Sequence, residues 1–174
     1  MSNWIAGRYA PIGRWGRLLS PEQRRHAAIK LADFVIKKTN VEETQYIDEL
    51  LADKTISDPE KKRLLNALAE KTDIHYFELE IAGDPECITY FLRAKAISAM
   101  EYALSADDFE TFAHCVSEAL AALVPDVLEF DKAFRDSVPV GLDRLGDVAV
   151  QLGLSETNPL TPEAPATQRH NEGG

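Results

Sequence analysis

The chain has 174 residues, 45% of them hydrophobic and 28% charged, which is enough apolar material for one domain with its own core. The longest apolar run, residues 119–124, is much shorter than the roughly 20 residues that cross a bilayer. Arginines interrupt the N-terminal region where a secretory signal would be apolar, and Cys87 and Cys115 are too few for a disulfide framework. We therefore expect a cytoplasmic protein with reduced thiols.

The net charge of −10 is spread unevenly. Residues 1–38 contain eight basic residues and two acidic ones, whereas the remaining 136 residues contain 11 basic and 27 acidic ones. A body this acidic repels nucleic acid and anionic lipid and attracts a basic protein surface. We expect a protein partner with a basic surface and neither a membrane nor a nucleic acid.

Residues 1–19 combine arginines with aromatic residues, including both tryptophans of the chain, Trp4 and Trp15. Arginine and aromatic side chains together can bind single-stranded nucleic acid. The acidic remainder of the chain favours an internal role instead, because a basic segment can dock on an acidic bundle. We predict that residues 1–19 form an irregular arm that packs on a helical domain of residues 20–154.

Prolines and capping residues predict where the helices of this domain begin. Ser20, Pro21 and Gln23 form a capping-box pattern, and prolines at 59 and 85 each follow an aspartate. Pro125 predicts another start. Apolar residues spaced by three and four then predict helices over 41–53, 59–71, 85–104 and 106–124.

The apolar residues of 85–104 surround most of the helix, which predicts a central position in a bundle. Residues 75–81 alternate as a strand would, but no partner strand is evident, so a short helix ended by Gly83 is preferred. A last short helix is predicted over 142–152, followed by a disordered, proline-rich tail at 155–174. The predicted fold is all-α: a compact single-domain bundle of about seven helices.

No motif for catalysis or for a cofactor is present: there is no phosphate-binding loop, no nucleophile elbow and no Cys-x-x-Cys pair. Glu110, His114 and Glu118 are spaced by four and share a helical face that could bind a divalent metal. Helical di-metal proteins use Glu-x-x-His from two helices, and this face lies opposite the stripe that contains Phe109 and Phe112. A solvated face is the preferred interpretation, and we expect no catalytic residues, metal or cofactor.

Unpaired carboxylates recur along residues 42–53 and 107–131. Like charges without basic neighbours cost a helix some stability, so such faces can reflect complementarity to a cationic partner. The predicted partner-binding residues are Glu42, Glu49, Asp53, Asp107, Asp108, Glu110, Glu118, Asp126, Glu129 and Asp131.

In size, charge, helicity and lack of catalytic motifs, this profile is similar to that of small acidic bacterial immunity or antitoxin-type proteins, which cover the positively charged cleft of a toxic enzyme. The resemblance implies a non-catalytic, stoichiometric inhibitor of a basic toxin or enzyme. Two alternatives stay open: a helical metal- or ligand-binding enzyme that uses Glu110, His114 and Glu118, and a scaffold or regulatory subunit of a larger assembly.

Overall fold

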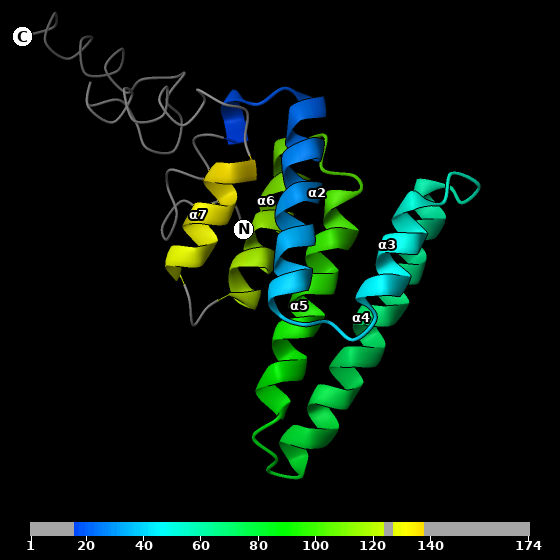
Figure 1. The fold of residues 1–174 in the computed structure, drawn as a ribbon, viewed down its shortest axis with the longest axis vertical. Coiled ribbons are helices and arrows are strands. Elements are labelled where there is room, and N and C mark those ends of the chain that lie inside the picture. Colours follow the sequence, from blue (N-terminus) through cyan, green and yellow to red (C-terminus); the bar gives the residue numbers. More distant parts are fainter. Residues whose placement is uncertain (1–15, 124–126, 138–174) are drawn as a thin grey trace, which may run out of the picture.

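The computed structural model describes residues 16–123 and 127–137, and within these ranges the chain is helical without any strand. The all-α prediction is confirmed (Figure 1). The helices are α2 (Pro21–Lys38), α3 (Thr44–Ala52), α4 (Asp58–Ile81), α5 (Cys87–Ala103), α6 (Phe109–Ala122) and α7 (Val127–Ser137). In this part of the chain, no helix is both long and apolar enough to cross a membrane.

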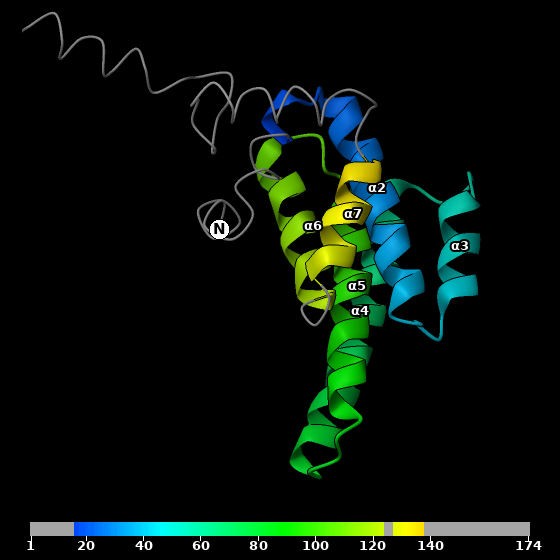
Figure 2. The same cartoon turned by 60° about the vertical axis from the view of Figure 1, so that its left-hand side comes forward.

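Helix α5 lies at the centre of the bundle and packs against α2, α4 and α6 (Figures 1 and 2). Its second half is almost completely buried through Ala96, Ile97, Ala99 and Met100. Alanines at these positions let neighbouring helices approach closely, and the burial of each larger side chain contributes about 2 kcal/mol. The prediction of a central helix at 85–104 is confirmed.

The first half of α5 differs from that prediction, because Ile88 is 58% exposed. Together with the second half of α4, this part of α5 forms an antiparallel hairpin that extends beyond the other helices (Figures 1 and 2). The apolar residues on all sides of α5 are therefore buried in the core only in the second half of the helix.

Helix α4 is one continuous helix of 24 residues, about 36 Å long, where the sequence predicted two helices at 59–71 and 75–81. The alternation in 75–81 arises because α4 has apolar residues on two opposite faces. Ser57, and not Asp58, caps the N-terminus, since its side chain accepts a hydrogen bond from the amide of Glu60.

Gly83 ends α4 as predicted, in a left-handed conformation with φ of 71°. The Gly83 amide donates to the carbonyl of Glu80, and the Asp84 amide donates to that of Leu79, which is the Schellman pattern. Asp84 does not cap α5, contrary to the prediction: it accepts from the amide of Glu86, and α5 begins only at Cys87.

Two further details correct the sequence analysis. The helix predicted at 106–124 begins at Phe109, because Asp108 is its N-cap. The apolar spacing within 41–53 places Tyr46 on the same side of the helix as Ile47 and Leu50, but Tyr46 is exposed, and in α3 only Ile47 and Leu50 are buried.

The end of the predicted arm, residues 16–19, packs on α6 through the guanidinium of Arg17, which lies 4.0 Å from the centre of the Phe109 ring. Helix α7 is held by Phe134, whose buried ring lies 6.3 Å from that of Phe112. Residues 1–15, the predicted helix at 142–152 and the predicted tail at 155–174 lie outside the described residues.

Candidate functional site

The outer face of α4 carries three large apolar side chains in solvent, which we call the outer stripe: Ile74, Phe77 and Ile81. Their exposed fractions are 60%, 54% and 87%. Spacings of three and four place them on one face of the helix. On the opposite, inner face, Leu65 is buried in the core, and the ring of the partly buried Tyr76 lies 5.5 Å from that of Phe91 on α5. Exposed apolar stripes of this kind mark interaction surfaces.

Carboxylates border the outer stripe along its length. Between residues 70 and 86, one basic residue, Lys71, stands among six acidic ones: Glu70, Asp73, Glu78, Glu80, Asp84 and Glu86. One of these carboxylates, that of Glu80, accepts a hydrogen bond from the Tyr76 hydroxyl at 2.9 Å, which raises the pKa of Tyr76. The exposed apolar side chains of the hairpin therefore lie in a negative electrostatic field.

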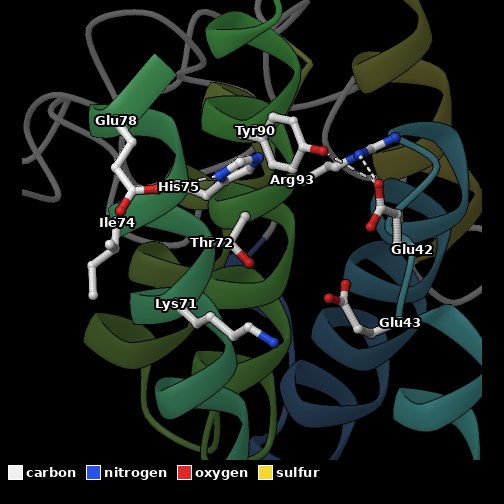
Figure 3. Close-up of a pocket in the computed structure, with 9 residues that line it drawn as sticks. All are labelled: Glu42, Glu43, Lys71, Thr72, Ile74, His75, Glu78, Tyr90 and Arg93. Atoms are coloured by element: carbon white, nitrogen blue, oxygen red, sulfur yellow. Dashed lines mark hydrogen bonds and ion pairs between the residues drawn. The ribbon is translucent and has the colours of Figure 1, made fainter. Parts of the chain in front are cut away.

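A pocket of about 380 Å³ opens beside the stripe, between the loop before α3 and the α4–α5 hairpin (Figure 3). Ile74 belongs to both the pocket and the outer stripe, so the two features adjoin. The residues that line the pocket are Glu42, Glu43, Lys71, Thr72, Ile74, His75, Glu78, Tyr90 and Arg93.

Five of the polar side chains that line the pocket contact one another. The guanidinium of Arg93 lies 3.1 Å from the carboxylate of Glu42, which also accepts a 3.4 Å hydrogen bond from the Tyr90 hydroxyl (Figure 3). The His75 ring meets the Tyr90 ring edge-on at 4.2 Å, and its Nδ1 lies 3.5 Å from Glu78. These contacts connect the loop before α3 to both helices of the hairpin, α4 and α5.

The turn after α2 positions Glu42 for this role. Asn40 adopts a left-handed conformation with φ of 53°, and its amide donates to the carbonyl of Lys37. The next amide, of Val41, donates to the carbonyl of Ile36, which completes a Schellman turn. Asparagine tolerates this conformation better than other side chains. Val41 is buried after the turn, and the chain then reaches the pocket at Glu42.

Several polar groups of the pocket already have partners in the protein. Arg93, Glu42 and His75 are each paired within the pocket, and the Thr72 hydroxyl donates to the carbonyl of Leu68 in its own helix. Among the described residues, no three His, Cys, Asp or Glu side chains are grouped so that they could hold a metal ion.

The predicted partner-binding residues of the first acidic face take different roles. Glu42 lines the pocket, as described above. Glu49 is exposed on α3 and accepts a 3.0 Å hydrogen bond from Gln45. Asp53 ends α3 and accepts bonds from the Thr55 hydroxyl and amide, which lower the pKa of its carboxyl group. Of these three, Glu49 is the residue without a role in a turn or an ion pair.

The second acidic face is also divided between structure and surface. The Asp107 carbonyl accepts from Arg24 at 2.6 Å. Asp108 caps α6 by accepting from the amide and hydroxyl of Thr111, which lowers the pKa of Asp108. Glu110 is exposed in the first turn of α6.

Glu118 and Glu129 have basic neighbours from other helices that the sequence does not reveal. Glu118 lies 3.3 Å from Lys95 of α5, and Glu129 lies 4.0 Å from Lys38 of α2. Asp126 and the side chain of Asp131 lie outside the described part of the structure.

The predicted solvated face of α6 is correct for Glu110 only. His114 is partly buried and stacks on Tyr102 with ring centres 5.0 Å apart, and Glu118 is tied to Lys95. Glu110, His114 and Glu118 therefore do not gather around a common point where a metal could bind.

The outer stripe and the contacts of Arg93 are not among the residues predicted from sequence. The spacing of Ile74, Phe77 and Ile81 by three and four is a helical signal in the sequence. A separate short element at 75–81 excludes Ile74 and therefore divides this pattern. Arg93 could not be paired with Glu42 from sequence, because 51 residues separate them.

No family model matches this chain, and neither a curated protein nor a solved structure is significantly similar to it. The outer stripe, its carboxylates and the adjoining pocket are therefore the features from which a function can be inferred.

Proposed function

We propose that the chain is a non-catalytic, acidic protein-binding module that acts in the cytoplasm. The observation that carries the proposal is the outer stripe, three large apolar side chains that α4 exposes among carboxylates. Burial of three such side chains by a partner contributes several kcal/mol, at about 25 cal/mol per Å². The surrounding negative charge selects a basic partner and accelerates its association.

The acidic surface of α3 is a second region that could contact a basic partner. Between residues 42 and 53 there are five acidic residues and no basic one. Glu49 is exposed on α3 and forms no ion pair with a described residue, so it can meet a cationic surface. Asp48 is also exposed, but it contributes, after Asp33, to the raised pKa of Lys37. Desolvation of such charges is offset when the partner supplies lysines or arginines.

The finer proposal is a stoichiometric inhibitor of the immunity or antitoxin type, whose target is a toxin or enzyme with a basic surface. Negative charge, helicity and a contact face without catalytic groups support it. In this account, the module acts by covering the target and not by chemistry on it.

The test is an affinity capture from a lysate of the organism that expresses the protein. The tagged wild-type chain is compared with the triple variant Ile74→Gln, Phe77→Gln and Ile81→Gln, which keeps good helix formers at exposed positions. We expect one basic protein at equal stoichiometry with the wild type, and its loss with the triple variant. Retention of the same protein by the triple variant would contradict the proposal.

The matched control is Ile88→Gln, which removes an exposed apolar side chain from α5 outside the stripe. Charge reversal is best made at Glu49 and Glu110, because Asp53 and Asp108 hold local turns and their replacement would also change stability. If the captured protein is an enzyme, an equimolar amount of the wild-type chain should inhibit it, and continued full activity would exclude the inhibitor role.

A further inference from the structure

We infer that the outer stripe is one side of a two-helix seam whose other side is a basic amphipathic helix of the partner protein. This inference rests on the proposed function and specifies the partner's contact element. It follows from the spacing of the stripe, from the charges beside it and from the way the hairpin projects.

The spacing is that of a coiled-coil seam. Ile74, Phe77 and Ile81 occupy successive a, d and a positions of a heptad, and Ala67 occupies the preceding a position. A second helix can place its own apolar residues between them, at anchors spaced by three and four. The three side chains lie along one continuous helix, so a single partner helix can contact all of them.

The positions that flank the seam select the charge of the partner. In this register, Lys71 and Glu78 are e positions, and Asp73 and Glu80 are g positions. Side chains at e and g determine which helices pair, because they meet across the seam. Three of these four are acidic, and Glu70 adds a fourth carboxylate at a d position. Lysines or arginines at the facing positions of the partner would be paired.

The same charges disfavour a second copy of this chain as the occupant. In a parallel pair, Asp73 of one copy would face Glu78 of the other. In an antiparallel pair, Asp73 would face Glu80. Like charges across a seam oppose association. In the antiparallel pair Lys71 would face Glu78 and offset the Asp73–Glu80 contact, but the Glu70 carboxylate at its d position would then enter the seam opposite Ile81. Charge thus acts against self-association and in favour of a basic partner helix.

The hairpin leaves room for this helix. The second half of α4 extends beyond α2, α6 and α7, and α5 covers its inner face only (Figures 1 and 2). At one end of the stripe, Ile74 borders the pocket, which Glu43 also lines, while the Glu42 carboxylate there is paired with Arg93 (Figure 3). A helix on the stripe would pass this rim, where a basic side chain would find the carboxylate of Glu43.

The experiment measures binding of the full chain to three designed peptides of about three heptads each. The first has leucine at a and d and lysine at e and g, and the second has glutamate in place of lysine. The third has the composition of the first in an order without heptads. We expect the lysine peptide to bind at least about tenfold more tightly than either control, with affinity that falls as salt rises from about 0.01 M to about 0.15 M.

The triple variant Ile74→Gln, Phe77→Gln and Ile81→Gln should lose at least about tenfold in affinity for the lysine peptide, whereas Ile88→Gln should change it by less than about twofold. Circular dichroism confirms that each variant is folded. Equal binding of the ordered and the scrambled lysine peptides would overturn the inference, because charge alone would then explain it. A dimer in sedimentation that the triple variant abolishes would also overturn it, with a second copy as the occupant.

The two proposals can fail separately. If the triple variant loses the cellular partner while the lysine peptide does not bind, the protein-binding function stands and the basic helix is wrong. If the lysine peptide binds the stripe while the triple variant retains the cellular partner, the function has been assigned to the wrong surface.

Discussion

The guanidinium of Arg93 lies 3.1 Å from the carboxylate of Glu42 and joins the central helix to the loop before α3. Arg93 is the more buried partner, and its Nε also donates to the carbonyl of Thr39 at 3.4 Å. One side chain of α5 thus holds both the end of α2 and the start of the acidic surface. The pocket keeps its form because this connection fixes the loop against the hairpin.

The first prediction concerns this pair. Arg93→Gln should destabilise the protein more than Glu42→Gln, because Arg93 also bonds Thr39. A double-mutant cycle in urea should give a coupling free energy of about 0.5–1 kcal/mol, as for a partly exposed ion pair. A coupling that cannot be distinguished from zero would mean that the contact does not hold the loop.

Gly83 provides the second prediction. A side chain at this position would touch nothing, so the cost of Gly83→Ala arises from the left-handed backbone alone, at about 1–2 kcal/mol. Gly83→Asn should cost less, because asparagine tolerates this conformation. Urea denaturation of the three proteins tests the order. Equal stability of the glycine and alanine forms would show that the turn is not left-handed.

The N-cap of α6 provides the third. Hydrogen bonds from the Thr111 amide and hydroxyl lower the pKa of Asp108 in the folded state below its unfolded value. Its charged form therefore stabilises the fold above the unfolded pKa, which is about 3.9, and this contribution is lost as the pH falls through the folded pKa. Asp108→Ala should cost about 1 kcal/mol at pH 7.

Asp108→Asn is the matched control for the pH effect, because asparagine caps a helix without titrating. Between pH 7 and acid, the wild type should lose more of its free energy of unfolding than the asparagine variant. Parallel pH profiles of the two proteins would show that the Asp108 carboxylate does not contribute through its charge.

The two faces of α4 give the fourth prediction. Leu65→Ala on the inner face should cost about 2–5 kcal/mol, because Leu65 is fully buried in the core. Ile81→Ala on the outer face should change stability by less than about 0.5 kcal/mol, because Ile81 is 87% exposed. A large loss for Ile81→Ala would mean that the outer stripe serves the fold, and the argument for a binding role would then fail.

The two cysteines give the fifth. Cys115 is buried, and desolvation strongly raises the pKa of its thiol, so it should resist a thiol reagent until the protein unfolds. Cys87 is partly exposed at the start of α5 and should be modified in the folded protein. Labelling of Cys87→Ser and Cys115→Ala, with and without urea, separates the sites. Rapid labelling of Cys115 in the folded protein would contradict the packing of α6 on α2.

Local features of the fold were predictable because they depend on near neighbours in sequence. The capping box at Ser20 and the ending of α4 at Gly83 each involve hydrogen bonds within a few residues, and both are observed. The central position of α5 was also predictable from its apolar residues. The continuity of α4 was not, because its two apolar faces serve different surroundings, and sequence does not reveal which face α5 covers.

The candidate site was less predictable than the fold. Acidic residues were identified from their pattern, but Asp53 and Asp108 proved to stabilise turns, and Glu118 is paired with Lys95 from another helix. The pairing of Glu118 with Lys95 joins residues far apart in the chain, so composition cannot reveal it, whereas the turn contacts of Asp53 and Asp108 are with near neighbours. The outer stripe could be identified only from the three-dimensional structure. Phe77 and Ile81 are exposed because the hairpin extends beyond the other helices (Figure 1).

The measurement that tests the central claim most directly is the captured protein's affinity for the wild-type chain, for the triple variant at Ile74, Phe77 and Ile81, and for the Ile88→Gln control. The account predicts that the triple variant loses at least about tenfold in affinity, whereas the control binds like the wild type. Equal affinity of all three proteins would contradict the assignment of partner binding to the outer face of α4.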